Sequence, residues 1–378
     1  MSPSSKGEKI YLKPKMAIQL GKWIEGAMAT LPPTFSGIIR NPEAKCNSQY
    51  KIFEWMALLH WYIIPMAWGL EFDKDVLENF AQFEKIVDVA MSHSPKSDNE
   101  LFSLYTLVKS FLLGFERLYV QNDPEKVVRC RLCIWQLIHV PTHMSWNGSI
   151  RFGSQATVER AIGEIGHKVQ SKKAPFANIA TLLFERANGK ALTLYYPCLS
   201  IPTKEKKIRA HLYQSLSVKK QELEGPSEYY NHLAAICDYL NLPLNMDIHM
   251  QRWGKCMIPG RITLRSRMSE KIGKALRSSR YFESEVNEEL IFGEAIAFYS
   301  LQDHDCNLVV YNELVNIFDV LGRWCGEWSE ECMVMKTSSI TKLVGIWEHM
   351  SRVHVLRRHG GLDMLNVEEY EVEEPTEG

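Results

Sequence analysis

The sequence predicts an α+β protein, with a large N-terminal α-helical region followed by a small C-terminal β-barrel-like domain. Three observations predict this class. Up to about residue 200, apolar residues repeat at three and four positions, which is typical of helices. From about residue 254, short apolar runs are bounded by Gly, Asn, Asp or Ser, which is typical of strands and turns. Hydrophobic residues make up 46% and charged residues 24% of the 378 positions, an ordinary globular balance.

The helical region is expected to span residues 1–200, with loops of a few residues between helices. Ser97 and Glu100 have the spacing of a capping box, in which each side chain bonds the backbone amide of the other. A helix should therefore begin there. The predicted helices are Pro14–Leu31, Tyr50–Ile64, Asp73–Met91, Leu101–Val120 and a last one that runs from Asp123 to Pro141.

The remaining residues fall into three parts. Residues 201–250 are expected to form a charged linker with a short helix, residues 251–366 the small β domain, and residues 367–378 an acidic disordered tail. Evenly spaced short strands are typical of a small barrel. The predicted strands are Ile262–Leu264, Leu290–Tyr299, Leu308–Tyr311, Cys332–Lys336, Leu343–Trp347 and Val353–Leu356.

The cysteines and the N-terminus bear on the cell compartment. Nine cysteines are scattered and odd in number, so reduced thiols are expected. The first residues, MSPSSKGEK, lack the apolar stretch of a secretion signal. The longest apolar run, Met56–Leu70, is short of a membrane span and contains His60 and Pro65. We therefore expect a nuclear or cytoplasmic protein that is not secreted and has no membrane partner.

The strongest charge signal lies between residues 252 and 280, where basic residues face a single acid, Glu270. Closely spaced cations release counterions from a phosphate backbone, and the interspersed serines add hydrogen bonds. Non-specific DNA binding is one interpretation, and an ordinary solvated basic face is the other. We call this segment the basic belt. Its predicted DNA-binding residues are Arg252, Lys255, Arg261, Arg265, Arg267, Lys271, Lys274, Arg277 and Arg280, with Lys172 and Lys173 further upstream.

Cys130 and Cys133 form a C-x-x-C pair that His139 and His143 follow. Zinc needs four ligands around one point. On one helix, Cys130 and His143 would lie about 20 Å apart along the axis, since each residue rises about 1.5 Å. No metal site is therefore expected here, and buried thiols are the preferred interpretation.

The segment from Trp135 to Pro175 combines an acid with basic residues. Ser154 has a side chain that can cap a helix, and a helix from about Gln155 would carry an apolar stripe. Glu159 lies at the edge of this stripe, and several basic residues follow it. A carboxylate beside an apolar seam suits a site that handles phosphate and metal, and it equally suits an ordinary amphipathic helix. The residues of the stripe are Val158, Ala161, Ile162 and Ile165.

This segment resembles the C-terminal part of the fungal Kyakuja-Dileera-Zisupton type transposases. The resemblance rests on His139, on Gly148 with Ser149 and Arg151, on QATVERAIG at 155–163, and on Lys172-Lys173 before Ala174-Pro175. That family has an RNase H-like core that uses three acidic residues and a divalent metal. The resemblance implies that Glu159 is the third acid. Val158 replaces the family's usual aromatic, and the first two acids have no counterpart in the 378 residues.

The C-terminal half extends the resemblance. FGEAIAFY at 292–299, GRWCGEWSEECMVMKTSSITKLVGIWE at 322–348 and VHVLRRHGGLDML at 353–365 resemble the β module that follows the catalytic part of these transposases. The resemblance implies that residues 1–200 are the tail of a transposase-like core with a helical insertion. These C-terminal motifs carry no catalytic signature.

Metal-dependent strand transfer needs a cluster of carboxylates that holds two ions about 4 Å apart. Glu159 is the one acid in a motif context, and Asp75, Asp88 and Glu116 have no motif support. We therefore expect a transposase-derived protein that lacks a complete catalytic triad and binds DNA non-specifically. No cofactor is expected, except Mg or Mn if a complete acidic triad forms, and enzymatic activity stays an open question. The alternative is a protein-interaction or scaffold module without a nucleic-acid role, bound by a protein partner or a full-length transposase.

Overall fold

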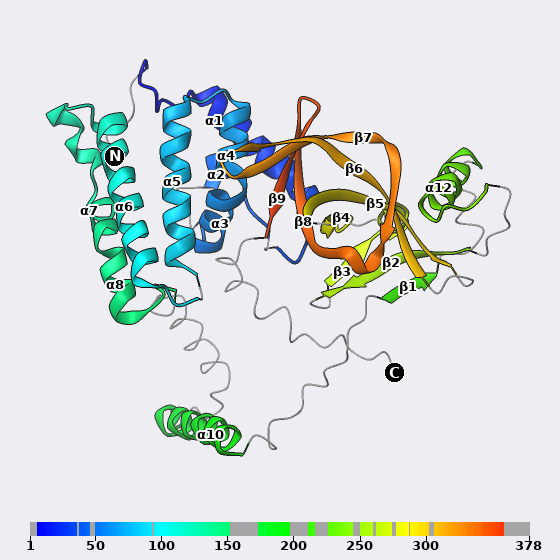
Figure 1. Ribbon diagram of the computed structural model, residues 1–378. Coiled ribbons are helices and arrows are strands. Elements are labelled where there is room, and N and C mark those ends of the chain that lie inside the picture. The colour runs from blue at the N-terminus through cyan, green and yellow to red at the C-terminus, as the bar shows by residue number, and fades with distance from the viewer. Residues whose placement is uncertain are drawn as a thin grey trace. The chain divides into compact units, whose positions relative to one another are not determined.

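The computed structural model describes residues 6–35, 38–45, 50–92, 94–151, 173–196, 211–215, 226–244, 250–259, 262–273, 277–286, 288–301 and 306–358. These residues form a mixed α+β protein with mostly N-terminal helices and a large antiparallel sheet (Figure 1). Contacts divide the chain into two units. The first unit contains Met1–Glu84, Leu113–Cys130 and Ile208–Gly378, and the second contains Lys85–Leu112 and Arg131–Lys207. The predicted boundary near residue 200 does not follow this division, because the first helices share a core with the sheet.

The helices of the first unit include the first three that the sequence predicts. The helix predicted at Tyr50–Ile64 is interrupted by a π turn, η2, and extends to Gly69. The elements before the sheet are α1 (Pro14–Ala27), η1 (Met28–Thr30), α2 (Pro42–Lys45), α3 (Ile52–Ala57), η2 (Leu58–Tyr62), α4 (Ile63–Gly69) and α5 (Lys74–Ala90, up to Glu84 in this unit). The shorter elements of this unit are η3 (Glu116–Val120), η4 (Pro124–Arg129), α12 (Pro226–Tyr239), α13 (Arg267–Gly273) and η8 (Thr337–Ser339).

One apolar core joins the early helices to the sheet. Two hydrogen bonds reinforce the contact. Trp61 Nε1 donates to the carbonyl oxygen of Arg357 at 2.9 Å, and the backbone amide of Ser278 donates to the carbonyl oxygen of Ala29 at 2.8 Å. Burial of each large side chain contributes about 1.5–3 kcal/mol. The core includes Ile24, Trp61, Tyr62 and Met66 from the helices, Leu31 and Phe35 from the segment after η1, and Ile258, Leu264, Phe282, Phe298, Trp347 and Leu356 from the strands.

The sheet has nine strands, and all of its pairings are antiparallel within the described residues. The sequence predicted six of them, but it missed β1, β2 and β4 and made β6 and β7 too short. The strands are β1 (His211–Ser215), β2 (Met250–Ile258), β3 (Ile262–Arg265), β4 (Tyr281–Val286), β5 (Glu289–Leu301), β6 (Cys306–Val320), β7 (Arg323–Lys336), β8 (Ile340–His349) and β9 (Arg352–Arg357).

Six of these strands pair in a cycle. β5 pairs with β4, β4 with β8, β8 with β9, β9 with β7, β7 with β6, and β6 pairs again with β5. The path of hydrogen-bonded neighbours therefore returns to its start. Strands β1, β2 and β3 lie outside this cycle and join it through the pairing of β2 with β5.

Two hairpins of the cycle have two-residue turns. Leu321 and Gly322 join β6 to β7, and Met350 and Ser351 join β8 to β9, all four with positive φ. Two successive residues with positive φ are the mark of the type I′ turn, whose twist matches that of the flanking strands. The Gly322 amide donates to Asp319 Oδ1 at 3.0 Å, which stabilises the first of these turns.

The second unit contains helices alone in its described part. The predicted capping box is confirmed: the Ser97 amide donates to Glu100 Oε2 at 2.8 Å, and the Glu100 amide donates to Ser97 Oγ at 3.4 Å. The helix predicted from Asp123 to Pro141 is wrong, because Arg131 is extended and breaks it. Pro141 lies in the first turn of a helix instead of ending one. The elements are α6 (Asp98–Phe115, up to Leu112 in this unit), α7 (Leu132–Trp135), η5 (Gln136–His139), α8 (Val140–Asn147) and α10 (Pro175–Tyr195).

Within the part of the chain that the structure describes, none of the helices combines the length and the apolar character needed to cross a bilayer.

Gly293 on β5 provides a test of the packing inside the strand cycle. A Cβ atom there would lie 2.6 Å from Phe282 Cζ and 2.7 Å from Tyr311 Cδ2. We expect Gly293→Ala to lower the free energy of unfolding by about 1–3 kcal/mol, measured by urea denaturation. Gly26→Ala is the control, because nothing lies within 4 Å of a Cβ there and the site is helical. It should stabilise slightly. Equal effects of the two variants would contradict the packing described here.

Candidate functional site

The residues predicted to act on DNA divide into those that the structure describes and those that it does not. Glu159 lies outside the described residues, as do Lys172, Arg261, Lys274 and the side chain of Lys271. Lys173 is exposed beside the start of α10. The other members of the basic belt lie on or beside β2, β3, α13 and β4, and most of them are engaged within the protein.

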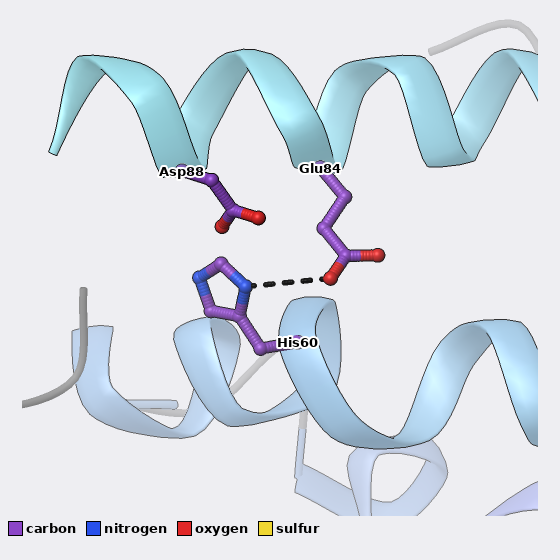
Figure 2. A group of neighbouring side chains, drawn as sticks. All are labelled: His60, Glu84 and Asp88. Atoms are coloured by element: carbon purple, nitrogen blue, oxygen red, sulfur yellow. Dashed lines mark ion pairs between the residues drawn. The ribbon is translucent and has the colours of Figure 1, made fainter. Parts of the chain in front are cut away.

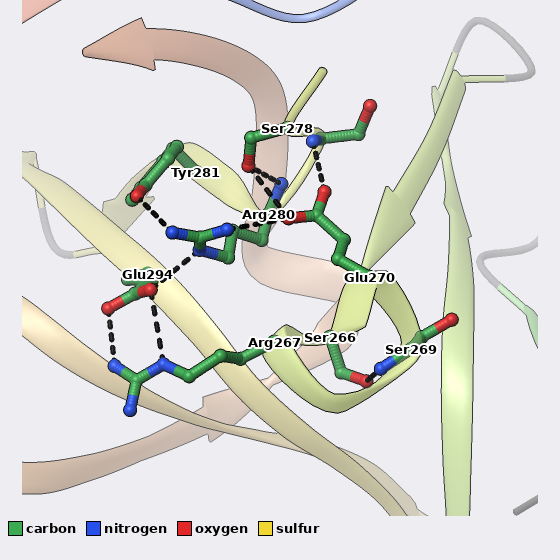
Figure 3. Close-up of polar contacts among 9 residues, drawn as sticks. Ser266, Arg267, Ser269, Glu270, Ser278, Arg280, Tyr281 and Glu294 are labelled. Carbon is green, nitrogen blue, oxygen red and sulfur yellow. Dashed lines mark hydrogen bonds and ion pairs between the residues drawn. The ribbon is translucent and has the colours of Figure 1, made fainter. Parts of the chain in front are cut away.

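Glu294 on β5 binds two arginines of the basic belt (Figure 3). Arg267 Nε lies 3.2 Å from Glu294 Oε1, and its Nη2 lies 2.5 Å from Oε2. Arg280 Nε donates to Glu294 Oε1 at 2.6 Å. The Glu294 residue is 7% exposed, so a buried carboxylate holds both of these partly exposed arginines.

Glu270 is a second buried acceptor. Arg280 Nη1 lies 2.7 Å from Glu270 Oε2, and Ser278 Oγ donates to the same oxygen at 2.9 Å. The Ser279 amide donates to Glu270 Oε1. Burial would lower the pKa of Arg280, but Tyr281 and these two glutamates raise it above its ordinary value. The guanidinium therefore stays charged and serves as an internal bridge.

Two further belt arginines also point into the protein. Arg277 donates to the carbonyl oxygens of Leu31 at 2.9 Å and Pro32 at 2.7 Å, so it ties the segment before β4 to the end of η1. Arg252 is 3% exposed and lies over the Tyr299 ring at 5.9 Å. The expectation that these residues form one solvent-facing basic surface is therefore wrong for Arg252, and the contacts of Arg267, Arg277 and Arg280 are internal.

Lys255 and Arg265 have a different position. They are direct partners in the register of β2 and β3, and both are half-buried. Like charges directly opposite each other on antiparallel strands destabilise the pair. Lys255 and Arg265 thus place two cations opposite each other on neighbouring strands.

A separate charge cluster joins α5, η2 and the sheet. His60 Nδ1 lies 3.6 Å from Glu84 Oε1, and both side chains are buried (Figure 2). Arg323 at the start of β7 pairs with the same glutamate oxygen, and its Nη2 also donates to the carbonyl oxygen of His60 at 2.9 Å. Burial lowers the pKa of Arg323 to about 10, which leaves it charged at neutral pH.

Asp88 follows Glu84 by one turn on α5, and with His60 they offer metal-ligand atoms within 4.8 Å of one another. Imidazole and carboxylate are common ligands of divalent metals. However, Arg323 already neutralises Glu84, and a bound cation would compete with it. The arrangement fits a structural ion pair better than a metal centre. Sequence reasoning missed it, although Glu84 follows the apolar Phe80 by four residues, and an acid at that spacing is a usable signal.

Two further histidines, His232 and His354, are buried within the first unit. His232 Nδ1 is 2.9 Å from the Tyr299 hydroxyl, and His354 Nε2 is 3.9 Å from Cys325 Sγ. Burial raises the pKa of the Cys325 thiol and lowers that of His354 to about 4. Both groups are therefore neutral at pH 7, and the pair is unsuited to nucleophilic catalysis, which needs a thiolate.

Cys130 is half-buried and Cys133 is exposed, both as free thiols, so the expectation that both are buried is wrong. Cys130 follows η4, and Cys133 lies in α7 after the extended Arg131. Because the chain changes direction between them, they do not share the buried face of one helix.

Large apolar side chains are exposed on the helices of the second unit. A contiguous solvent-exposed apolar patch marks a protein-interaction surface more often than a single exposed apolar residue does. Aromatic residues are also enriched at the centres of such interfaces. The exposed residues and their exposed fractions are Phe102 71%, Leu132 73%, Trp146 74%, Phe176 84%, Phe184 67%, Leu194 81% and Tyr195 81%.

Comparison with known proteins adds no assignment: no family model, no curated protein and no solved structure matches the chain.

His232 and His354 predict a loss of stability in mild acid. Burial, with the charges of Arg252 and Arg267, lowers the pKa of His232 to about 4. Burial, with His349 and Arg352, does the same to His354. A histidine whose pKa is lower in the folded state contributes stability that is complete above its ordinary pKa of 6.5 and is lost as the pH falls towards 4. We expect about 2–3 kcal/mol from each.

The measurement is urea denaturation at several pH values between about 7 and 4.5. His354→Leu should make the dependence of unfolding free energy on pH about half as steep. His143→Leu, which replaces an exposed histidine, is the matched control and should leave it unchanged. An unchanged slope in His354→Leu would show that His354 does not titrate as its burial requires.

Proposed function

We propose that this chain is a protein-interaction module, in which the sheet unit is a stable frame and the helices of the second unit offer the contact surface. The observation that carries the proposal is the exposure of large apolar residues on these helices. Phe102, Leu132 and Trp146 are each more than two-thirds exposed, on α6, α7 and α8 respectively. Exposed aromatic and leucine side chains gain free energy when a partner covers them.

The internal use of the basic belt supports the same proposal. Arg267 and Arg280 share buried glutamates, and Arg277 bonds backbone carbonyls. Side chains held in this way are not available to phosphates without breaking those bonds. The strand cycle suits a rigid frame, and we propose that it is the small barrel that the sequence predicts.

A second candidate function is non-specific binding of a polyanion such as DNA, and one observation favours it. Lys255 and Arg265 lie opposite each other on β2 and β3, and two neighbouring cations can both contact one phosphate. This candidate also implies that the chain descends from a fungal transposase, that Glu159 is a remnant of an acidic triad, and that the protein is nuclear. Two cations give a weak site, so we rank this candidate second.

The first test places a photoreactive residue on the proposed surface. With benzoylphenylalanine in place of Trp146 or Phe102, irradiation of cells should give covalent adducts with a defined partner. The same replacement of Glu330, an exposed residue of β7, is the control and should give none of these adducts. Adducts that are identical at all three positions, or absent at all three, would contradict the interaction module.

The second test separates the two candidates. Anisotropy of a labelled DNA duplex is measured at about 50 mM salt and then at increasing salt. The interaction module predicts no saturable binding. Binding that weakens steeply with salt and is lost in the double variant Lys255→Glu with Arg265→Glu, but retained in Lys336→Glu on β7, would support the polyanion candidate instead. Thermal unfolding of each variant shows whether the fold is kept.

A further inference from the structure

Residues 6–13 form a strap that precedes α1 and is held to the first unit by charged side chains. Its apolar residues take little part in the core, since Ile10 and Tyr11 are half-buried and Leu12 is exposed. By contrast, α1 buries Ile24 and Ala27 in the core that it shares with the sheet. The attachment of the strap therefore depends mainly on polar contacts, which two neighbouring residues provide.

Glu8 is the first anchor, and it binds two cations of η4. Arg129 Nη1 donates to Glu8 Oε1 at 3.2 Å, and its Nη2 donates to Oε2 at 3.0 Å. Lys126 Nζ lies 2.8 Å from Glu8 Oε1. The Glu8 and Arg129 side chains are 8% and 5% exposed. Because a buried charge is costly without its counter-charge, removal of either partner strongly disfavours this arrangement.

Lys9 is the second anchor, and it binds two acids at the start of α5. Its Nζ lies 3.1 Å from Asp73 Oδ2 and 2.8 Å from Asp75 Oδ2. The Lys9 side chain is 49% exposed, so salt screens these pairs and each of them is weak. Glu8 therefore supplies the stronger attachment, and Lys9 supplies the one that responds to ionic strength.

The strap acts on the point where the chain leaves the first unit. Arg129 is the last residue of η4, and the boundary between the two units falls between Cys130 and Arg131. Arg129 Nη1 also donates to the carbonyl oxygen of Tyr119 at 2.9 Å, which ties the end of η4 to η3. The Cys130 amide donates to the carbonyl oxygen of Val127 at 2.9 Å and closes the last turn of η4. One arginine thus links the strap, η3 and the end of η4.

We propose that the strap is a latch, which opens without unfolding of the sheet and releases the end of η4 when it opens. Segments with few buried apolar contacts open locally at a smaller free-energy cost than the core around them. When the latch is closed, Glu8 fixes the Arg129 guanidinium below the surface. When it is open, Arg129 lacks this carboxylate and turns to water, and the last turn of η4 loosens. The latch goes beyond the proposed function and does not depend on it.

Hydrogen exchange of the full chain, followed by mass spectrometry of its peptides, tests the latch. Glu8→Gln should speed exchange in peptides that cover residues 124–130 at least about tenfold, because it removes the charge that holds Arg129. Peptides from β5 and β6 should exchange as in the wild type, since the sheet stays folded. Glu25→Gln is the matched control, because Glu25 is an exposed acid of α1, and it should leave all of these rates unchanged.

Salt provides an independent test. Raising the salt concentration from about 50 to 500 mM should speed wild-type exchange in the same η4 peptides, since it screens Lys9 from Asp73 and Asp75. Lys9→Gln should remove most of this salt response. Unchanged exchange of residues 124–130 in Glu8→Gln would overturn the latch. An equal acceleration in β5 and β6 would also overturn it, because the opening would then be global.

Discussion

Five glutamates are buried among the described residues, and each one pairs with an arginine. Glu54 binds Arg40, Glu84 binds Arg323, and Glu283 binds Arg357, while Glu270 and Glu294 share Arg280 and Glu294 also binds Arg267. A carboxylate below the surface is costly unless a cation and further hydrogen bonds satisfy it. Burial alone would raise the pKa of Glu54, but the Arg40 guanidinium and two backbone amides lower it to about 2. These glutamates therefore fix where the arginines lie.

This constraint explains why a count of charges along the chain does not show which basic residues face solvent. The basic belt contains one acid, Glu270, and so it reads as an unneutralised stretch. Glu294, the acid that pairs with both Arg267 and Arg280, comes from β5, where it lies in an apolar sequence. The pairing of strands that are distant in sequence brings Glu294 next to these arginines, and no local sequence pattern predicts that pairing. A charge cluster becomes a binding surface only when its partners in space are known.

Local signals predicted local structure well. The capping box at Ser97 and Glu100 and the helices α1 and α5 follow from spacing and side-chain type. Strands rich in apolar residues, such as β5, were also predictable. β4 was not, because Glu283 and Ser284 are buried there by contacts with Arg357 and the Ser339 carbonyl oxygen, and in sequence they suggest a surface loop. The shared core of η2 and the sheet likewise depends on contacts between residues that are hundreds of positions apart.

The cycle of strands has a consequence for how the chain behaves in a crowded solution. Strands whose backbone groups are all taken up by neighbours offer no template to another chain. In the part of the chain that the structure describes, β1 and β3 each pair with β2 alone. Among the described strands, their other edges are the ones along which a foreign strand could add. Outside the strand cycle, the described edges that could accept a foreign strand therefore belong to β1 and β3, of five and four residues.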